Sequence, residues 1–361
     1  MNPEKRLTHI LIIGAGPTGL SAALELAHAG LKPELVEKRA GPSEFSRAVG
    51  IIPVTRYNLR HAGVGDAILK ESVPWRKFAF YRGNKTLLDL DLSGEVQPEE
   101  CILGLPQDRT ESLIRDALAG LGVETKYNTE AIKLETTDDL ATVTFADGRV
   151  ESYNWVIACD GKHSAMREQL GIAYDGHDLE ETWSIADIDM SEDFDCERCR
   201  FWIQGEHGHI ATCLPIEKRR ARALASTPDA LKAIPVDLGV TNVRRAGTFK
   251  ISVRQAETYR KGRVLLAGDS AHCHSPVGGS GMNLGIDDAI AAAQAIINET
   301  TEFYSDERRP VGAKVLKLTE AARKKVSSES LADKMAFSVA MTAMQHVSAL
   351  HGPLIRKLTA L

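Results

Sequence analysis

Three glycines near the amino terminus have the spacing of a phosphate-binding turn. The stretch Gly14-x-Gly16-x-x-Gly19 follows a short apolar run, His9 to Ile13, and opens a helix-forming segment. In such a turn the first glycine allows a tight bend, the second lets a pyrophosphate approach the backbone, and the third lets helix and strand pack closely. The free N–H groups at the start of the helix favour an anion. A glycine-rich turn without a ligand is the alternative, but the context favours a dinucleotide site that includes Gly14, Gly16, Pro17, Thr18 and Gly19.

A carboxylate in the following segment completes this unit. The helix-forming segment ends near Gly30, and Glu34 to Glu37 has the pattern of a second strand, which makes a βαβ unit. At the end of that strand Glu37 can accept hydrogen bonds from a ribose diol. The neighbouring Lys38 is included in the candidate site.

The most informative segment comes late in the chain. A buried strand, Arg263 to Ala267, ends at Gly268-Asp269. Asp269 is therefore expected at the carboxyl edge of the sheet, where such sheets bind ligands. The following glycines bring bare backbone against something flat or bulky, and a helix beginning near Met282 directs its amino end, which stabilises negative charge, to the same place. A further strand-to-turn stretch, Cys159-Asp160-Gly161, has little weight alone because Asp-Gly is a common turn.

These motifs need two kinds of scaffold. We predict an α/β fold, with a Rossmann-like nucleotide-binding domain interrupted by a mostly β substrate domain and followed by a helical carboxy-terminal tail. Hairpins are predicted at 78–90 and 200–214. Helical segments are predicted at 58–70, broken by Gly63 and Gly65, at 282–298, and from Pro310 almost to the end. The predicted boundaries are 1–72, 97–172 and 255–305 for the nucleotide-binding domain, 73–96 and 173–254 for the substrate domain, and 306–361 for the helical segment.

Taken together, the motifs resemble the group A flavoprotein monooxygenases, the para-hydroxybenzoate-hydroxylase-like family, and most of all its branch of phenol and polyketide hydroxylases. Ser46-Arg47-Ala48 and Leu105-Pro106-Gln107 match further family stretches, so the resemblance spans residues 8 to 325. It implies FAD as the cofactor of the Rossmann-like domain and NADH or NADPH as a transient electron donor. It also implies that O2 adds to the reduced flavin as a C4a-hydroperoxide, which hydroxylates a small substrate, expected to be aromatic or phenolic.

The resemblance also implies roles for individual residues. Glu37 would hold the adenosine ribose, Arg47 and Gln107 would contact FAD, and Asp160 with Gly161 would serve the diphosphate and the passing NAD(P)H. Gly268 and Asp269 would bind the ribityl chain. The isoalloxazine ring would be lined by Pro276, Gly279, Gly281, Met282 and Asn283. We nominate no catalytic side chain, because the flavin carries the chemistry, although Arg47 and Pro276 are expected near the ring.

Two departures from the family pattern keep other functions open. Ser280 stands where the family usually has Gln, and the stretch between Ala293 and Tyr304 is short. A non-catalytic flavin-binding protein and an FAD-dependent reductase on the same scaffold are the alternatives. A flavin halogenase is disfavoured, because none of the four tryptophans lies in a Trp-x-Trp-x-Ile-Pro stretch.

Composition excludes several other classes. The 361 residues are 43% hydrophobic and 26% charged with a formal net charge of −5, which gives no reason to expect nucleic acid or an anionic membrane. No apolar stretch approaches a membrane span, and six cysteines form no disulfide framework, so a cytoplasmic location is expected. We predict no metal: Cys196-x-x-Cys199 with His207 matches no familiar zinc spacing and is interpreted as solvent-side thiols. The apolar tail 331–350 is a candidate homodimer contact.

Overall fold

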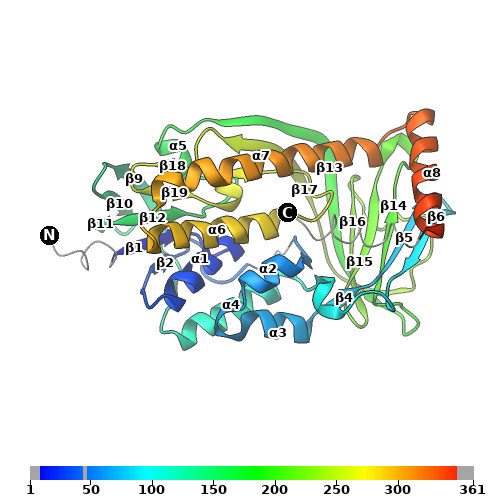
Figure 1. Cartoon of the computed structure of the whole chain (residues 1–361), viewed down its shortest axis with the longest axis horizontal. Helices are drawn as coiled ribbons and strands as arrows, with labels where there is room; N and C mark the ends of the chain where they lie inside the picture. Colours follow the sequence, from blue (N-terminus) through cyan, green and yellow to red (C-terminus); the bar gives the residue numbers. More distant parts are fainter. Residues whose placement is uncertain (1–8, 44–46, 348–361) are drawn as a thin grey trace.

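A six-stranded sheet forms one end of the molecule (Figure 1). The computed structural model describes residues 9–43 and 47–347. The strand order is β18-β19-β12-β1-β2-β8, and all pairs are parallel except β18 with β19. Short apolar runs form the central strands because both faces of the sheet are covered. The strands are β1 (Ile10–Ile13), β2 (Glu34–Val36), β8 (Thr125–Lys126), β12 (Trp155–Ala158), β18 (Arg260–Lys261) and β19 (Val264–Leu266).

Helices and a small antiparallel sheet accompany this parallel sheet. The helix α1 (Pro17–His28) contacts both α4 (Gln107–Gly120) and α6 (Gly281–Ile297). Gly30, with a φ of 83°, follows the end of α1, as its position in the sequence predicts. The remaining elements at this end are β9 (Ala131–Thr136), β10 (Ala141–Phe145), β11 (Val150–Tyr153) and the short helix α5 (Ala165–Gln169).

An eight-stranded sheet forms the other end, in the order β20-β17-β13-β16-β15-β14-β5-β6. Two strands of 17 residues each, β13 and β17, run from the first sheet into this one. Both predicted hairpins are present, as the pairs β5–β6 and β14–β15. The strands are β5 (Lys77–Arg82), β6 (Lys85–Asp91), β13 (Tyr174–Met190), β14 (Arg198–Trp202), β15 (Ala211–Glu217), β16 (Arg220–Ala225), β17 (Val240–Ala256) and β20 (His272–Cys273).

A second small sheet connects the two ends. It contains β3 (Gly50–Ile51), β4 (Val73–Trp75) and β7 (Ile102–Gly104), and the indole of Trp75 donates a hydrogen bond to Pro215 O at 2.9 Å. The helical segment predicted at 58–70, with breaks at Gly63 and Gly65, is interrupted at the first of these glycines. The helix α3 (Val64–Glu71) begins after Gly63, which adopts a φ of 76°, whereas Gly65 lies inside α3. The helix α2 (Pro53–Asn58) precedes this segment.

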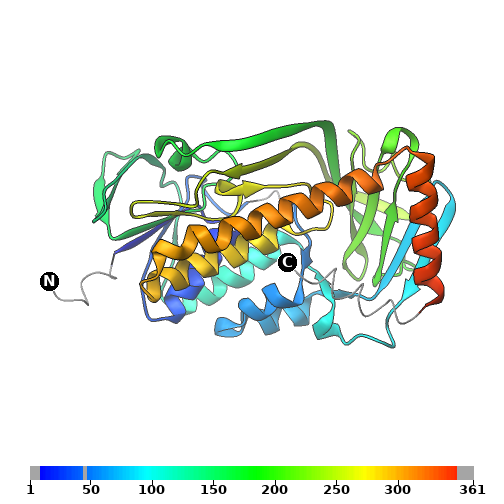
Figure 2. The same cartoon turned by 45° about the horizontal axis from the view of Figure 1, so that its top comes forward.

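The last two helices run away from the parallel sheet. Figure 2 shows α7 (Thr301–Val326) passing along the molecule to α8 (Leu331–His346) beside the eight-stranded sheet. The prediction that this helix begins at Pro310 was wrong, because α7 begins nine residues earlier. Tyr304 anchors its first turn by donating to Leu266 O at 2.8 Å, and the exposed Pro310 leaves the freed carbonyl to solvent. The predicted helical stretch after residue 347 lies outside the described residues.

None of the helices in the described part of the chain combines the length and hydropathy that a membrane-spanning helix requires.

Candidate functional site

Three loops meet at one edge of the six-stranded sheet. The neighbouring parallel strands β1, β12 and β19 end at Ile13, Ala158 and Leu266. Gly14–Gly19, Asp160-Gly161 and Gly268-Asp269 follow directly after these strands. Motifs that are more than a hundred residues apart in the sequence therefore converge at the carboxyl edge, which is the ligand-binding edge of such sheets.

The glycines of the first loop have two different tasks. A Cβ on Gly14 would lie 2.4 Å from Cys159 O, and one on Gly19 would lie 1.9 Å from Gly14 O. Both positions therefore require glycine for the chain to pack. A Cβ on Gly16 would meet nothing within 4 Å, although this residue has ordinary extended geometry. The space beside Gly16 is what a bound phosphate would need.

The amino end of α1 is open to an anion. Among the residues that the structure describes, no side chain caps Gly16, and Pro17 occupies the first turn. The first backbone N–H groups can therefore bind a ligand. Thr18 fills the gap between α1 and its neighbours, because a Cβ on Gly268 or Gly285 would lie 2.5 or 2.8 Å from its Oγ1.

Glu37 is fixed at the end of β2. Its carboxylate accepts hydrogen bonds from Ala15 N at 3.0 Å and from the backbone and guanidinium of Arg39 at 2.9–3.0 Å. Burial acts to raise the pKa of Glu37, but the hydrogen bonds from Arg39 and Ala15 outweigh it and hold the pKa below its ordinary value. Glu37 is therefore an ionised acceptor beside the glycine turn, while Lys38 next to it is exposed.

Asp269 has a carboxylate available for a ligand. Among the described residues no donor bonds this carboxylate, whereas Tyr174 donates to its backbone oxygen at 3.0 Å. Asp269 is exposed to solvent. Nevertheless, burial among the surrounding protein atoms raises the pKa of its carboxyl group, and the charges of His272, Arg47 and Lys162 act to lower it. A side chain that lines an open recess within the protein has both properties.

The backbone of the turn that carries Asp269 is held by residues that the sequence analysis did not identify. Arg167 donates to Ser270 O at 3.0 Å, and its guanidinium lies 3.7 Å from the centre of the Tyr174 ring. Arg167 was visible only as part of the Asp160-Gly161 stretch, and nothing in the sequence indicated its distant partner.

Asp160 and Gly161 differ in their surroundings. The Asp160 carboxylate accepts from Ser164 Oγ at 2.6 Å and from Met166 N at 3.2 Å, so it holds the start of α5. Gly161 has a φ of 85° and open space where a Cβ would stand. The contact between Asp160 and FAD stays a prediction, and the geometry shows only a local supporting contact for its side chain.

The second glycine-rich loop ends at the amino terminus of α6. Asn283, 1% exposed, accepts from Ile52 N at 3.1 Å and donates to Gly50 O and Gly279 O at 2.9 and 3.2 Å. Gly279 closes a turn by donating to Pro276 O at 2.9 Å. Within residues 9–43 and 47–347, no side chain caps this helix at Ser280, so the backbone N–H groups at Gly281 and Met282 can bind a ligand.

A third segment reaches the same region from the other side. Gln107 N donates to Ala48 O at 3.1 Å, which ties α4 to the residues after the gap at 44–46. The guanidinium of Arg47 lies 5.4 Å from the centre of the Phe249 ring on β17. Ser46, part of the same sequence motif, lies outside the described residues.

The donor set fits a flavin dinucleotide: two uncapped helix termini for negative charge, a free carboxylate, a second carboxylate beside the glycine turn, and bare backbone at Gly16 and Gly279. A family model described as FAD binding domain matches residues 7–319. The chain belongs to this FAD-binding family.

The curated proteins to which this chain is similar are monooxygenases. The chain is 33% identical over 349 residues to the 12-dehydrotetracycline 5-monooxygenase/anhydrotetracycline 6-monooxygenase of Streptomyces rimosus, covering 86% of this chain and 68% of that protein. It is 30% identical to pentachlorophenol 4-monooxygenase of Sphingobium chlorophenolicum, covering 86% and 64%. The solved OxyS anhydrotetracycline hydroxylase from Streptomyces rimosus superposes with a TM-score of 0.77 at 30% identity, covering 98% and 76%.

These findings confirm the fold, the FAD cofactor and the class of enzyme expected from the sequence. The chain is an FAD-dependent monooxygenase, and NAD(P)H is the electron donor typical of its family. The p-nitrophenol 4-monooxygenase of Pseudomonas putida, with a TM-score of 0.85 at 24% identity over 98% of both chains, agrees in fold.

A buried charged cluster lies behind the flavin motif of the monooxygenase, and sequence reasoning missed it. The Asp288 carboxylate pairs with His272 and accepts from Arg308 Nε at 2.7 Å, which joins β20, α6 and α7. His272 therefore has a structural contact in this cluster. His274 is different: burial lowers its pKa to about 4, and its Nε2 has no partner among the described residues.

The predicted solvent-side position of the Cys196 and Cys199 thiols is wrong for Cys199. Cys199 has 0% exposure within the eight-stranded sheet, and burial raises its pKa well above the ordinary value. Alternation along β14 turns Cys199 inward, while Cys196 lies half-buried before the strand.

A substitution at Gly16 should separate binding of FAD from folding. We expect Gly16→Val to leave the thermal stability of the FAD-free protein unchanged within about 0.5 kcal/mol, because the new side chain meets open space. FAD affinity should fall roughly tenfold to a hundredfold, because the side chain overpacks the phosphate position. FAD titration and thermal unfolding of the apoprotein measure both. Gly19→Ala is the matched control and should disrupt the folded loop. An unchanged FAD affinity in Gly16→Val would show that this turn is not part of the FAD site.

Asp287 should make stability depend on pH. Burial raises the pKa of its carboxyl to about 6, against the hydrogen bond from Asn58. A raised carboxyl pKa stabilises the fold at low pH, and this contribution is lost as the pH rises through about 6. Asp287→Asn should therefore be more stable than the wild type above this pH, by on the order of 2–3 kcal/mol, and equal to it in acid.

Urea unfolding of the FAD-loaded protein between acid and neutral pH tests this prediction, with the exposed Asp306→Asn as control. A stability difference that does not change with pH would contradict it.

Proposed function

We propose that this FAD-dependent monooxygenase hydroxylates a small aromatic or phenolic compound, held between the flavin and the adjoining face of the eight-stranded sheet. The observation that carries the proposal is the contact of Arg47 with Phe249, which joins a candidate flavin segment to an aromatic side chain of that face.

This flavin-side face is apolar but contains a few buried polar atoms. Trp183, Phe201, Phe249 and Leu224 pack in one cluster with Val277 of the glycine-rich loop. Trp183 Nε1 and Thr212 Oγ1 are buried without a hydrogen-bond partner among the described residues. A mostly apolar pocket with a few polar groups is the usual environment for a small organic ligand. Both groups are available to an oxygenated substrate.

When bound, FAD supplies the redox and oxygen-transfer chemistry, taking electrons from NAD(P)H and passing oxygen to the substrate. The residues of the chain position this cofactor and exclude water. The uncapped end of α6 stabilises negative charge at the flavin. The aromatic face orients a flat ring and keeps the reacting region dry.

The names of two relatives support this substrate class, since one acts on pentachlorophenol and one on anhydrotetracycline. Pentachlorophenol is a phenol. The two proteins are 30% and 33% identical to this chain over 86% of its length.

Oxygen uptake measured beside NADH or NADPH oxidation tests the proposal on FAD-loaded protein, across phenols and polycyclic aromatics. We expect one compound to accelerate both rates and to yield a hydroxylated product. FAD-free Gly16→Val protein is the control. Oxidation of NAD(P)H that no aromatic compound accelerates, with peroxide as the product, would overturn the proposed substrate class and favour a reductase or another donor.

We also propose the site and domain assignments made from the sequence. The FAD set comprises the glycine turn, Glu37, Lys38, Arg47, Gln107, Asp160, Gly161 and Asp269, with Pro276 and the residues 279–283 at the ring. The division into domains is supported by the separate sheets. The exposed Leu331, Met335 and Val339 on α8 favour a homodimer contact, and six free cysteines favour a reducing cytoplasm.

A further inference from the structure

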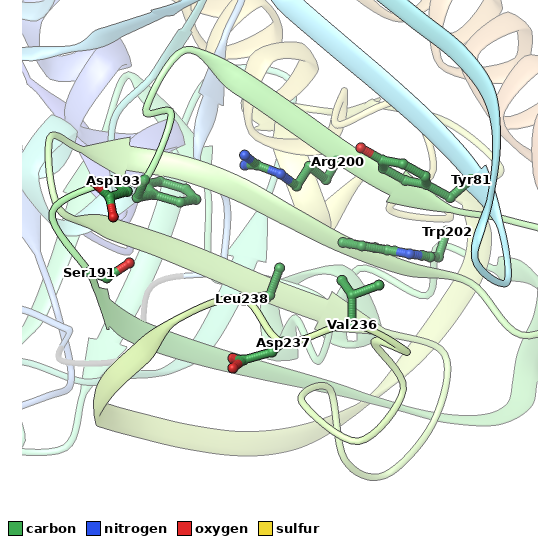
Figure 3. Close-up of a pocket in the computed structure, with 9 residues that line it drawn as sticks. Tyr81, Ser191, Asp193, Arg200, Trp202, Val236, Asp237 and Leu238 are labelled. Carbon is green, nitrogen blue, oxygen red and sulfur yellow. The ribbon is translucent and has the colours of Figure 1, made fainter.

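A pocket of about 220 Å³ lies on the other face of the eight-stranded sheet (Figure 3). Phe201 packs with the flavin-side cluster, whereas the next residue on β14, Trp202, packs in a separate cluster with Ala211 and Cys213. Neighbouring residues of a strand point to opposite faces. The pocket, lined by Trp202, is therefore separated from the flavin side by the sheet itself.

Stacked aromatic rings form one wall of this pocket. The rings of Tyr81 and Trp202 lie 5.2 Å apart at an angle of 21°, and Figure 3 shows Trp202 between Tyr81 and Val236. Trp202 is 5% exposed, and its Nε1 has no hydrogen-bond partner among the described residues. An unsatisfied buried donor is costly, so an acceptor supplied by a ligand would be stabilised there.

A positive charge lies beside this wall. The guanidinium of Arg200 is 5.1 Å from the Phe194 ring centre, and its one hydrogen bond is to Arg198 O at 3.2 Å. In the described part of the chain Arg200 pairs with no carboxylate within salt-bridge distance. Asp193 and Asp237 line the pocket and are exposed. The pocket therefore offers donors on one side and acceptors at its rim.

We propose that this pocket binds a second small molecule, a planar aromatic compound of one or two rings that carries an acidic oxygen and a hydroxyl or amino donor. The rings would lie against Tyr81 and Trp202. The acidic oxygen would accept from Trp202 Nε1 and Arg200, and the donor would meet Asp193 or Asp237. The volume is below the roughly 300–1,000 Å³ of sites for drug-sized ligands, so the occupant is small.

Equilibrium dialysis of 3-hydroxy-2-naphthoate against the FAD-loaded protein tests the proposal. The visible flavin spectrum is recorded in parallel, because a compound beside the flavin alters it and a compound in this pocket does not. We expect binding that leaves the flavin spectrum unchanged. Trp202→Phe keeps an aromatic ring, although a smaller one, and removes the indole N–H donor, so it should weaken this binding roughly tenfold.

Val236→Trp provides a variant with little risk to the fold, because Val236 is 42% exposed. Its larger side chain fills the pocket and should abolish this binding, with FAD content and melting temperature unchanged. Lys250→Met, an exposed cation elsewhere on the same sheet, is the control and should bind as the wild type does. Equal binding in all variants, or binding that always alters the flavin spectrum, would overturn the second site and leave the monooxygenase function untouched.

Discussion

Asp269→Ala is expected to give a folded protein that loses FAD on gel filtration. The Asp269 carboxylate is the acceptor at the carboxyl edge of β19 that bonds no donor among the described residues. A hydrogen bond to a charged acceptor contributes about 1.5–3 kcal/mol, so its loss should weaken FAD binding by roughly tenfold to more than a hundredfold. The flavin-to-protein absorbance ratio after gel filtration measures the loss, and monooxygenase activity should fall with it.

The neighbouring turn should remain in place in this variant. Arg167 and Tyr174 hold the backbone of residues 269 and 270, and neither contact involves the Asp269 side chain. Asp175→Ala, which changes an exposed aspartate on β13, is the control and should retain FAD. Normal FAD content in Asp269→Ala would show that this carboxylate does not hold the cofactor.

Asp187→Ala should have the largest effect on stability. This carboxylate is 3% exposed and accepts from Arg222 Nε at 2.6 Å, Arg222 Nη2 at 2.8 Å and Arg245 Nε at 2.8 Å. Removing one member of a buried ion pair typically costs about 3–5 kcal/mol. Urea unfolding of the FAD-loaded protein should show a loss of this order.

The same substitution should disturb the flavin side of the sheet. Arg222 also donates to Ala48 O at 3.1 Å, which places the Arg47 segment against β16. Asp189→Ala is a matched control on the same strand, because Asp189 pairs with the exposed Arg244. An exposed pair contributes little to stability, so this variant should lose much less than Asp187→Ala. Similar losses from both variants would contradict a special role for the buried pair.

Local sequence patterns predicted the parts of the site that depend on the backbone. Each motif is a turn that follows an apolar strand and precedes a helix. Such turns need glycines where the backbone is tight and carboxylates where a ligand binds, so they can be recognised from residue type and spacing. The βαβ unit, the turn at Gly14 to Gly19, the position of Asp269 and the interruption by a mostly β region all follow from such local patterns. These patterns predict a dinucleotide-binding site, and their resemblance to a known family implies the cofactor and the reaction class.

Long-range packing determines which distant side chains meet, and local patterns did not predict these contacts. The contacts of Arg167 with Ser270 and of Arg222 with Ala48 join residues that are 103 and 174 positions apart. Likewise, α7 begins at Thr301 because Tyr304 and Arg308 bond to β19 and α6, which overrides the local preference of Pro310. The burial of the Cys199 side chain and the position of the pocket beside Trp202 both depend on the register of the strands. Such features arise from long-range packing, which residue type and spacing alone do not specify.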